Sequence, residues 1–371
     1  MVAGETYYIE FPKNCKEGLI TAYVLQNECG GLAKKLLERG IKSNSLRQVY
    51  KIHYTKEREE TIMKKRIVAF LSLATVLFTG IVSVQTVQAS DVNNPFELPS
   101  TFSDNVTLYE IESALNTYIT ENNLNIEVGT PEYIEFLANL SITNEYPNID
   151  ETQLRYFRSY ASVYLSKANT QIGNTVSLLN DGYKTIADIR QENIEQEQAL
   201  EQQQPIQPIQ PKEAYALINA KEYARAHAII PDFSYRVYLS DCTNFASHIL
   251  REGGFDPNPD WHYNGDLYPT GNLIWIQASG FVQYWSLIRG YLGEVCTDAT
   301  EVNAYADEGD FLVWKNSDTY EWYHTQFVQS KNMLAEISCT QHTPNYFNVN
   351  FNSRVDSTTF DTNKVYIVDM P

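Results

Sequence analysis

Residues 240–254 constrain the fold most, because they read as one complete helix with a cysteine in its first turn. Ser240 or Asp241 is suited to cap the helix N-terminus, and Gly253-Gly254 supplies the left-handed residue that ends a helix. One face of this helix is apolar and carries the cysteine at helical spacing: Cys242, Phe245, Ala246, Ile249 and Leu250. The helix dipole and free N–H groups there favour a thiolate, the nucleophilic form of cysteine. The alternative is a buried structural cysteine, since free cysteine is among the most buried residue types.

The beginning of the chain has the pattern of an export signal placed after an unrelated segment. Residues 63–89 combine Met63-Lys64-Lys65-Arg66, an apolar run over 67–84 and a cleavage-type end at Val87-Gln88-Ala89. A signal belongs at an N-terminus, so we interpret residues 1–62 as a mis-called N-terminal extension. The localisation expected is secreted or cell-wall associated. The alternative is a membrane anchor, since 67–84 is just long enough to cross a bilayer.

The charge of the chain excludes one class of partner. The formal net charge is −18, and the acid excess lies after residue 89, because residues 1–89 carry more basic than acidic side chains. A strongly acidic chain without a basic patch does not suit nucleic acid. We therefore predict no nucleic-acid partner.

The rest of the chain divides by composition. Residues 90–200 form a predicted helical region of unknown role, with helices opening near Thr107, at Thr130-Pro131 and at Asp150-Glu151. Its plainest interpretation is a spacer, and the alternative is a surface, over 104–200, that binds the cell wall or a protein. Residues 201–211 are a Gln/Pro-rich linker. The domain at 212–371 has helices first, one more of them near 280–290, and then strands at 310–314, 324–330, 334–343 and 364–369, which predicts an α+β fold.

A cysteine nucleophile needs a base, and the base needs a partner that fixes its tautomer. His324 opens a predicted strand, where it can face the N-terminus of the Cys242 helix, whereas His248 lies on the opposite face of that helix from Cys242. On the next strand, alternation places Gln341 on the core side and directs Thr340 and His342 outward. Gln341 is thus the preferred orienting residue. The alternative for His324 is an ordinary hydrogen-bonded strand histidine, and the alternative for Gln341 is a strand-end polar residue that caps a backbone group.

The C-terminal domain resembles the bacterial putative amidase domain family, which is similar to the cysteine- and histidine-dependent (CHAP) papain-like amidohydrolases. The resemblance covers about 212–369 and is carried by Glu213-Ala214-Tyr215, Glu222-Tyr223-Ala224, the block Asp241-Cys242-Thr243-Asn244-Phe245-Ala246-Ser247, Gly309-Asp310 and Gln341-His342-Thr343. It implies a papain-like fold, Cys242 as nucleophile, His324 as base and Gln341 as the third residue. The sequence reads Tyr323-His324-Thr325 where the family often has Asp-His-Val.

The resemblance implies a secreted cysteine amidase or peptidase that cleaves amide bonds, with cell-wall peptidoglycan as the expected substrate. We expect substrate contacts from Asp241, Asn244, Trp275 and His342. Two alternatives stay open: a catalytically silent papain-like scaffold that binds wall or surface ligands, and an acyl transferase of transglutaminase type.

Three cysteines follow the predicted signal: Cys242, Cys296 and Cys339. The odd number fits one reactive thiol, and a Cys296–Cys339 disulfide is possible in an exported chain. No paired-cysteine, HExxH or Gly-rich phosphate motif is present, so we predict neither a metal nor a cofactor.

Overall fold

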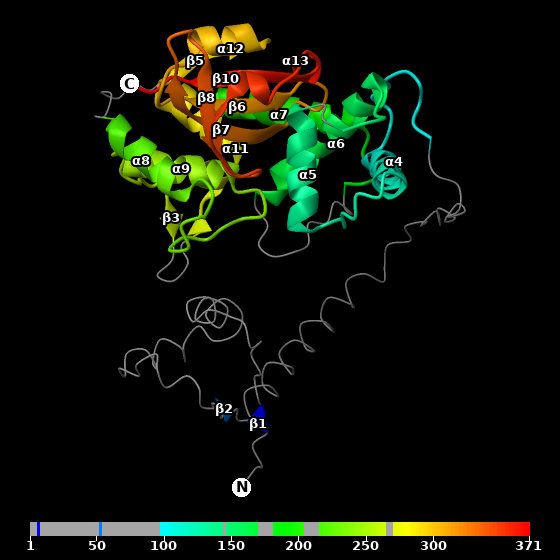
Figure 1. Cartoon of the computed structure of the whole chain (residues 1–371), viewed down its shortest axis with the longest axis horizontal. Helices are drawn as coiled ribbons and strands as arrows, with labels where there is room; N and C mark the ends of the chain where they lie inside the picture. Colours follow the sequence, from blue (N-terminus) through cyan, green and yellow to red (C-terminus); the bar gives the residue numbers. More distant parts are fainter. Residues whose placement is uncertain are drawn as a thin grey trace. The chain divides into compact units, whose positions relative to one another are not determined.

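A computed structural model describes residues 6–7, 52–53, 97–143, 146–169, 181–203, 215–264 and 270–371 (Figure 1). They belong to two units, 1–90 and 91–371. In the first, β1 (Thr6–Tyr7) pairs antiparallel with β2 (Ile52–His53). The predicted signal at 63–89, most of the extension at 1–62 and most of the linker at 201–211 lie outside the described residues, so these remain predictions.

The second unit is built on a six-stranded antiparallel sheet with the order β5-β10-β6-β7-β8-β9. The strands are β5 (Leu292–Cys296), β6 (Phe311–Asn316), β7 (Trp322–Lys331), β8 (Ile337–Gln341), β9 (Tyr346–Asn350) and β10 (Asn363–Val368). The four strands predicted from sequence are confirmed as β6, β7, β8 and β10. The sequence pattern does not reveal β5 and β9, because these edge strands are short and most of their side chains are partly or fully exposed.

Four helices precede the linker: α4 (Leu108–Glu121), α5 (Pro131–Ile142), α6 (Glu151–Ala168) and α7 (Ile186–Gln203). The first three begin where the sequence predicts. Thr107, Thr130 and Asp150 each accept a hydrogen bond from the backbone N–H three residues further on. Helix α6 is shorter than its apolar pattern allows and has Asn169 as its C-terminal cap.

These helices form a layer on the sheet. Helix α6 packs against β6 and β7, and one hydrophobic cluster joins Leu137 and Phe157 of the helices to Trp314 and Val328 of the sheet. In Figure 1 helices α5 and α6 lie beside the strands of this sheet. The spacer interpretation of residues 104–200 does not describe this arrangement, because a spacer would share no core with the domain that follows it.

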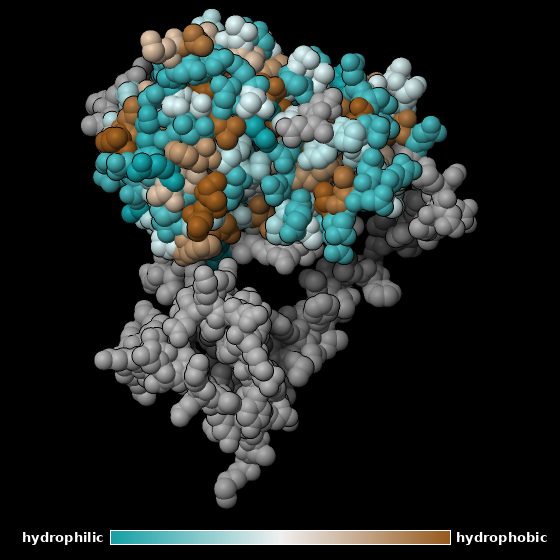
Figure 2. All heavy atoms as spheres, viewed as in Figure 1, coloured by the Kyte–Doolittle hydropathy of each residue, from teal (hydrophilic) through white to brown (hydrophobic). Residues whose placement is uncertain are grey.

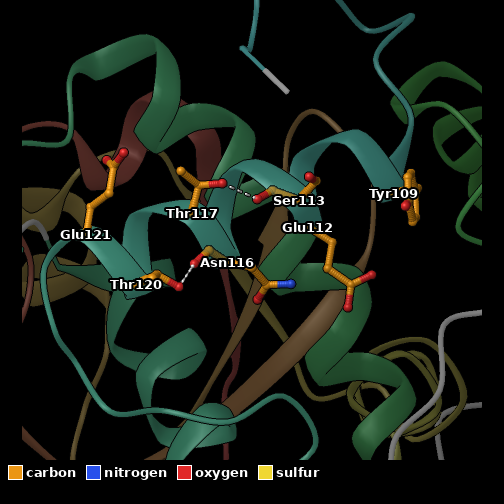
Figure 3. Close-up of a pocket in the computed structure, with 7 residues that line it drawn as sticks. All are labelled: Tyr109, Glu112, Ser113, Asn116, Thr117, Thr120 and Glu121. Atoms are coloured by element: carbon orange, nitrogen blue, oxygen red, sulfur yellow. Dashed lines mark hydrogen bonds between the residues drawn. The ribbon is translucent and has the colours of Figure 1, made fainter. Parts of the chain in front are cut away.

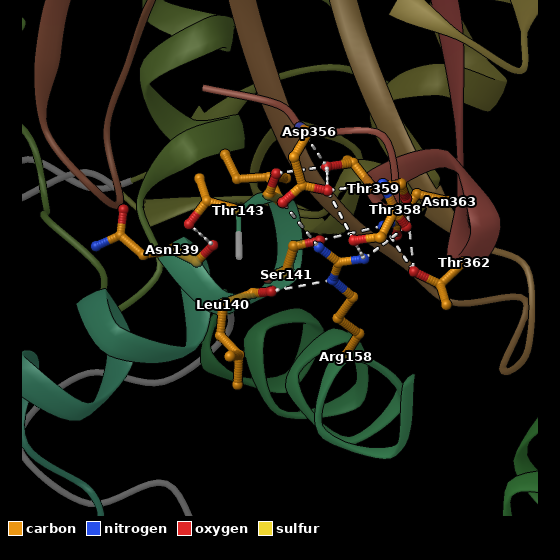
Figure 4. Close-up of polar contacts among 11 residues, drawn as sticks. Asn139, Leu140, Ser141, Thr143, Arg158, Asp356, Thr358, Thr359, Thr362 and Asn363 are labelled. Carbon is orange, nitrogen blue, oxygen red and sulfur yellow. Dashed lines mark hydrogen bonds and ion pairs between the residues drawn. The ribbon is translucent and has the colours of Figure 1, made fainter. Parts of the chain in front are cut away.

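Arg158 of α6 links the helical region to the segment before β10. Its guanidinium donates to the carbonyl oxygen of Leu140 at 3.2 Å and to the carbonyl oxygen and Oγ1 of Thr358 at 2.6 and 3.2 Å (Figure 4). The carboxylate of Asp356 is 3.8 Å away. Burial lowers the pKa of Arg158, and Asp356 acts in the opposite direction. A buried guanidinium is tolerated only with such acceptors, so this link is polar as well as apolar.

The second layer lies on the opposite face of the sheet. It comprises α8 (Leu217–His227), α9 (Cys242–Glu252), α10 (Leu273–Ile276), α11 (Ala278–Val282), the π-helix η2 (Gln283–Ile288) and the hairpin β3 (Tyr263–Asn264) and β4 (Thr270–Gly271). Its core gathers Trp261, Trp275 and Trp285 against Phe311 and Phe327 of the sheet. The helix predicted near 280–290 corresponds to α11 and η2.

Three short elements, α12 (Ala299–Tyr305), the 3-10 helix η3 (Phe351–Ser353) and α13 (Thr359–Thr362), complete the unit. The α+β class is confirmed, and a papain-like fold stays a prediction.

The sequence predicts that Thr340 of β8 and His342, just after this strand, face outward, and this prediction is wrong. Thr340 and His342 are 0% and 2% exposed. Alternation separates a buried from an exposed face only when one face of the sheet meets water. Here helices pack on both faces, so neighbouring positions of β8 are buried together.

Candidate active site

Cys242 is the first residue of α9, and the end of this helix is as predicted. The chain turns at Gly254, whose φ of 102° is in the left-handed region. The predicted side-chain cap at the other end is wrong. Asp241 occupies the cap position, but its side chain makes no capping bond to the helix. It accepts instead from the Tyr238 N–H and the Asn244 amide, both at 2.9 Å. The first-turn N–H groups of α9 are therefore left without a side-chain cap.

The sulfur of Cys242 is buried in polar surroundings, with 1% of the residue exposed. Its Sγ lies 3.7 to 3.9 Å from four oxygens: Asn169 Oδ1, Thr243 Oγ1, Ser240 Oγ and the carbonyl oxygen of Tyr323. The backbone N–H of Thr325 also donates to it. These contacts come from three elements, α6, α9 and β7, so the thiol lies where the layers meet.

Burial raises the pKa of the Cys242 thiol, and the hydrogen bonds from Thr325, Thr243 and Ser240 only partly oppose this effect. Desolvation disfavours the charged form of any thiol. The thiolate that the helix dipole favours is therefore not the resting form in this arrangement. A nucleophilic role would therefore require the thiol to lose its proton when substrate arrives.

The contact predicted between His324 and Gln341 is present. Nε2 of His324 is 2.7 Å from Oε1 of Gln341, whose Nε2 donates to the carbonyl oxygen of Pro344 at 3.1 Å. The bond to Pro344 orients the Gln341 amide, so its oxygen faces the imidazole and requires a proton on His324 Nε2. Nδ1 is then the basic nitrogen. Burial lowers the pKa of His324 to about 4, which keeps the ring neutral near pH 7.

The Cys242 sulfur contacts the β7 backbone next to His324, but it is not bonded to the His324 side chain. Thr325 faces α9, with its Oγ1 3.0 Å from that of Thr243, whereas His324 is paired with Trp314 across the sheet. Neighbouring strand residues point to opposite faces. Among the described residues no hydrogen bond joins the sulfur to the imidazole. The sulfur instead meets the backbone on either side of His324.

The four residues expected to contact substrate are joined into one buried chain of hydrogen bonds. His342 Nδ1 is 2.7 Å from Asp241 Oδ2, Asp241 accepts from Asn244, and Asn244 Oδ1 accepts from Trp275 Nε1 at 3.1 Å. His342 also stacks on Phe245, with ring centroids 3.9 Å apart. Trp275 is fully buried. In this arrangement these four hydrogen-bonded side chains position the N-terminus of α9 and offer no free polar group to substrate.

Sequence reasoning missed Asn169, which lies 73 residues before Cys242. Its nearest sequence signal is the end of the apolar pattern of α6, which marks a helix terminus but no partner. The other two cysteines that follow the predicted signal, Cys296 and Cys339, are both buried and free, so the possible disulfide between them is not formed.

A surface hollow of about 480 Å³ is lined by none of these residues; Figure 3 shows the side chains that line it. One face of α4 lines it: Tyr109, Glu112, Ser113, Asn116, Thr117, Thr120 and Glu121. It contains no cysteine or histidine, so it is not the candidate active site. In the described parts of the chain, no group of three His, Cys, Asp or Glu side chains could hold a metal ion. Nor is any helix there long and apolar enough to span a bilayer.

Comparison with known proteins gives one match. Residues 214–368 match a family model described as "Putative amidase domain", which supports amide-bond hydrolysis as the activity of this segment. The matched segment includes α9, β7 and β8, and it begins after Asn169. The comparisons with curated proteins and with solved structures found no match.

Proposed function

Starting from the amidase-like character of residues 214–368, we propose that this protein is a cysteine amidohydrolase. Cys242 is the nucleophile, His324 the general base and acid, and Gln341 the residue that fixes the His324 tautomer. Asp241, Asn244 and His342 position the first turn of α9. No cofactor takes part in this mechanism.

The reaction is acyl transfer in two steps. His324 Nδ1 takes the thiol proton, and Sγ attacks the amide carbonyl carbon, so that a C–S bond forms and the carbonyl electron pair moves to oxygen. Collapse of this oxyanion breaks the C–N bond, and the imidazolium gives its proton to the leaving amine. Water, deprotonated by His324, then hydrolyses the thioester and releases the carboxylic acid and the free thiol.

The observation that carries this proposal is the position of Cys242 at a helix N-terminus without a side-chain cap, beside a histidine whose tautomer is fixed. Uncapped N–H groups at that position are suited to stabilise an oxyanion. Because the two side chains are not bonded in this structure, the mechanism requires a rearrangement that brings the His324 imidazole to the Cys242 sulfur when substrate binds. Catalytic hydrogen bonds are often long in ligand-free enzymes and form in the complex with substrate.

We propose peptidoglycan peptides as the substrate class and the exterior of the cell as the site of action. The signal pattern at 63–89 supports export. Figure 2 shows a mostly polar face on which apolar side chains form small separate groups, as suits a polar polymer substrate. Three exposed apolar residues lie just before the Cys242 helix in the sequence and are available to contact the substrate. They are Ile229, Ile230 and Phe233, each 59 to 65% exposed.

Replacement of Cys242 tests the mechanism. Cys242→Ala removes the nucleophile, so release of free amino groups from purified peptidoglycan should fall at least about 10³-fold, as for other essential nucleophiles. The control is Cys296→Ala, which removes another buried free cysteine that lies outside the site. It should retain wild-type activity once both proteins are shown to be folded. Equal hydrolysis by wild type and Cys242→Ala would refute the cysteine mechanism.

A second candidate is a catalytically silent scaffold that binds cell-wall material. Two observations favour it: the raised pKa of the Cys242 thiol and the absence of a bond to His324. This candidate predicts that wild type and Cys242→Ala bind insoluble peptidoglycan equally and release nothing from it. A cosedimentation assay run beside the hydrolysis assay separates the two functions.

A further inference from the structure

Asn169 reaches the cysteine site from the helical region. It caps the C-terminus of α6, where its backbone N–H donates to the Leu165 carbonyl oxygen at 3.2 Å. The preceding carbonyl, of Ala168, accepts from the Ser240 N–H at 3.4 Å, so the end of α6 touches the segment that leads into α9. The Asn169 side chain is enclosed by these contacts and is 1% exposed.

The two ends of the Asn169 amide differ in their partners. Oδ1 accepts from the Cys242 thiol at an S···O distance of 3.7 Å. Nδ2 is buried and makes no hydrogen bond within the described residues. A buried donor without an acceptor is destabilising, and such groups in native structures usually have a functional or structural reason. Here the unpaired N–H donor belongs to the group that contacts the nucleophilic sulfur.

The N-terminus of α9 provides the complementary observation. Because the Asp241 side chain bonds Tyr238, Asn244 and His342, it leaves the first-turn N–H groups of this 11-residue helix uncapped. The uncapped backbone donors thus belong to the helix turn that carries the sulfur, and the unpaired side-chain donor belongs to an amide whose oxygen contacts that sulfur.

We propose that Asn169 is a catalytic residue, whose Nδ2–H donates to the oxyanion that forms when the Cys242 sulfur attacks an amide carbonyl. The inference deepens the proposed function and rests on it. While the thiol is protonated, it donates a hydrogen bond to Asn169 Oδ1. When His324 has taken that proton, rotation of the amide directs Nδ2–H to the sulfur, and then to the oxygen that receives the carbonyl electron pair. The helical region therefore supplies part of the active site.

The test compares four full-length proteins: wild type, Asn169→Asp, Asn169→Ala and Asn122→Asp. Asn169→Asp keeps an acceptor oxygen and removes the N–H donors at nearly constant size. Asn122 is the matched control, because it caps the C-terminus of α4 with its amide donating to the Tyr118 carbonyl oxygen at 2.9 Å. The readouts are kcat and KM for release of amino groups from solubilised peptidoglycan, and the pH titration of thiolate ultraviolet absorbance relative to Cys242→Ala.

For both Asn169 variants we expect kcat to fall by about 10²–10³, with KM changed less than about threefold, as when one oxyanion donor is removed. In Asn169→Asp the thiolate titration should also move to higher pH, because a carboxylate replaces a donor. Asn122→Asp should match wild type in both readouts. A merely structural cap would lower the melting temperature without moving the titration or kcat.

The failure of this inference and the failure of the proposed function give different results. If wild type hydrolyses peptidoglycan through Cys242 and both folded Asn169 variants keep wild-type kcat, the Asn169 inference is wrong and the function stands. If wild type hydrolyses nothing, the function is wrong. The thiolate titration then decides whether Asn169 donates to the sulfur, and an unchanged titration in Asn169→Asp rejects that contact. Should Asn169→Asp not fold, Asn169→Ala decides on kcat.

Discussion

His248, on the face of α9 turned away from Cys242, is a buried imidazole whose ring nitrogens make no hydrogen bond to any residue that the structure describes. The Tyr235 and Trp275 rings lie 3.9 and 5.2 Å from it, centroid to centroid. Burial lowers the pKa of His248 to about 3. The unfolded chain binds a proton near pH 6.5 that the folded protein does not bind until about pH 3. Stability contributed by neutral His248 is therefore present at neutral pH and is lost as the pH falls through this window.

We predict that His248→Phe makes the protein less sensitive to acid. Phenylalanine fits among the same rings and has no proton to gain. The free energy of unfolding should fall between pH 7 and pH 5 by about 2 kcal/mol less in the variant than in wild type, the value for one group over 1.5 pH units below its ordinary pKa. Urea unfolding of both proteins at the two pH values measures the difference. Parallel losses would contradict the prediction.

For single residues, the sequence predicts where Cys242 and Gln341 lie in their elements better than it predicts whether a side chain is charged. The cysteine at a helix start and the strand parity of Gln341 are local patterns, and both appear in the structure. The protonation of Cys242 depends on burial by α6 and β7, which lie far from it in the chain. Likewise, Asp241 does not cap the helix as expected, and its carboxylate instead bonds His342, which lies 101 residues away.

The elements α6 and α7 together enclose the turn between β6 and β7, from which the chain runs to His324. Arg155 of α6 makes a bidentate pair with Asp318 at 2.8 and 2.6 Å, and Asn193 of α7 donates to Glu321 at 2.7 Å. Bidentate pairs restrict geometry as well as supplying energy. The start of β7, and with it the position of His324, the proposed base, is thus fixed by helices outside the amidase-like segment.

Arg158 should be the strongest single polar link between these layers. Arg158→Ala leaves its buried acceptors in α5 and beside α13 without a donor, so we expect a loss of about 3–5 kcal/mol, typical of breaking a buried charged network. The control is Arg225→Ala, at an exposed position of α8, which should cost no more than about 0.5 kcal/mol. Denaturant unfolding of the full chain measures both. A loss below about 1 kcal/mol for Arg158→Ala would show that packing alone joins the layers.

Element prediction succeeded where the signal is local and failed where it is not. Capping residues such as Thr107 and Asp150 act within three residues of the helix start, so they can be read from sequence. The edge strand β9 has alternating polar residues and one paired side, which leave a weak pattern. Both faces of β8 are buried because helices from distant segments cover them, and no periodicity in β8 itself records that.

On the scale of the whole molecule, residues 205–371 should not form a stable domain alone. Without α6 the sheet face that carries Trp314, Val328 and Ile337 would be open to water. We expect a 205–371 fragment to aggregate or to bind a hydrophobic dye with little near-ultraviolet circular dichroism, whereas 91–371 should be monodisperse with ordered aromatic signals. A soluble, well-ordered 205–371 fragment would contradict this prediction. The comparison also decides which fragment is suitable for activity assays.

The contact between α6 and the cysteine has a consequence for biosynthesis. The ribosome makes Ala168 and Asn169 before it makes Ser240 and Cys242. The end of α6 is therefore uncovered until the later segment has been made. A nascent or prematurely ended chain contains no thiol with its full set of neighbours. The Cys242 sulfur thus gains its full set of neighbours only after β7, which supplies Tyr323 and Thr325, has been made and has docked.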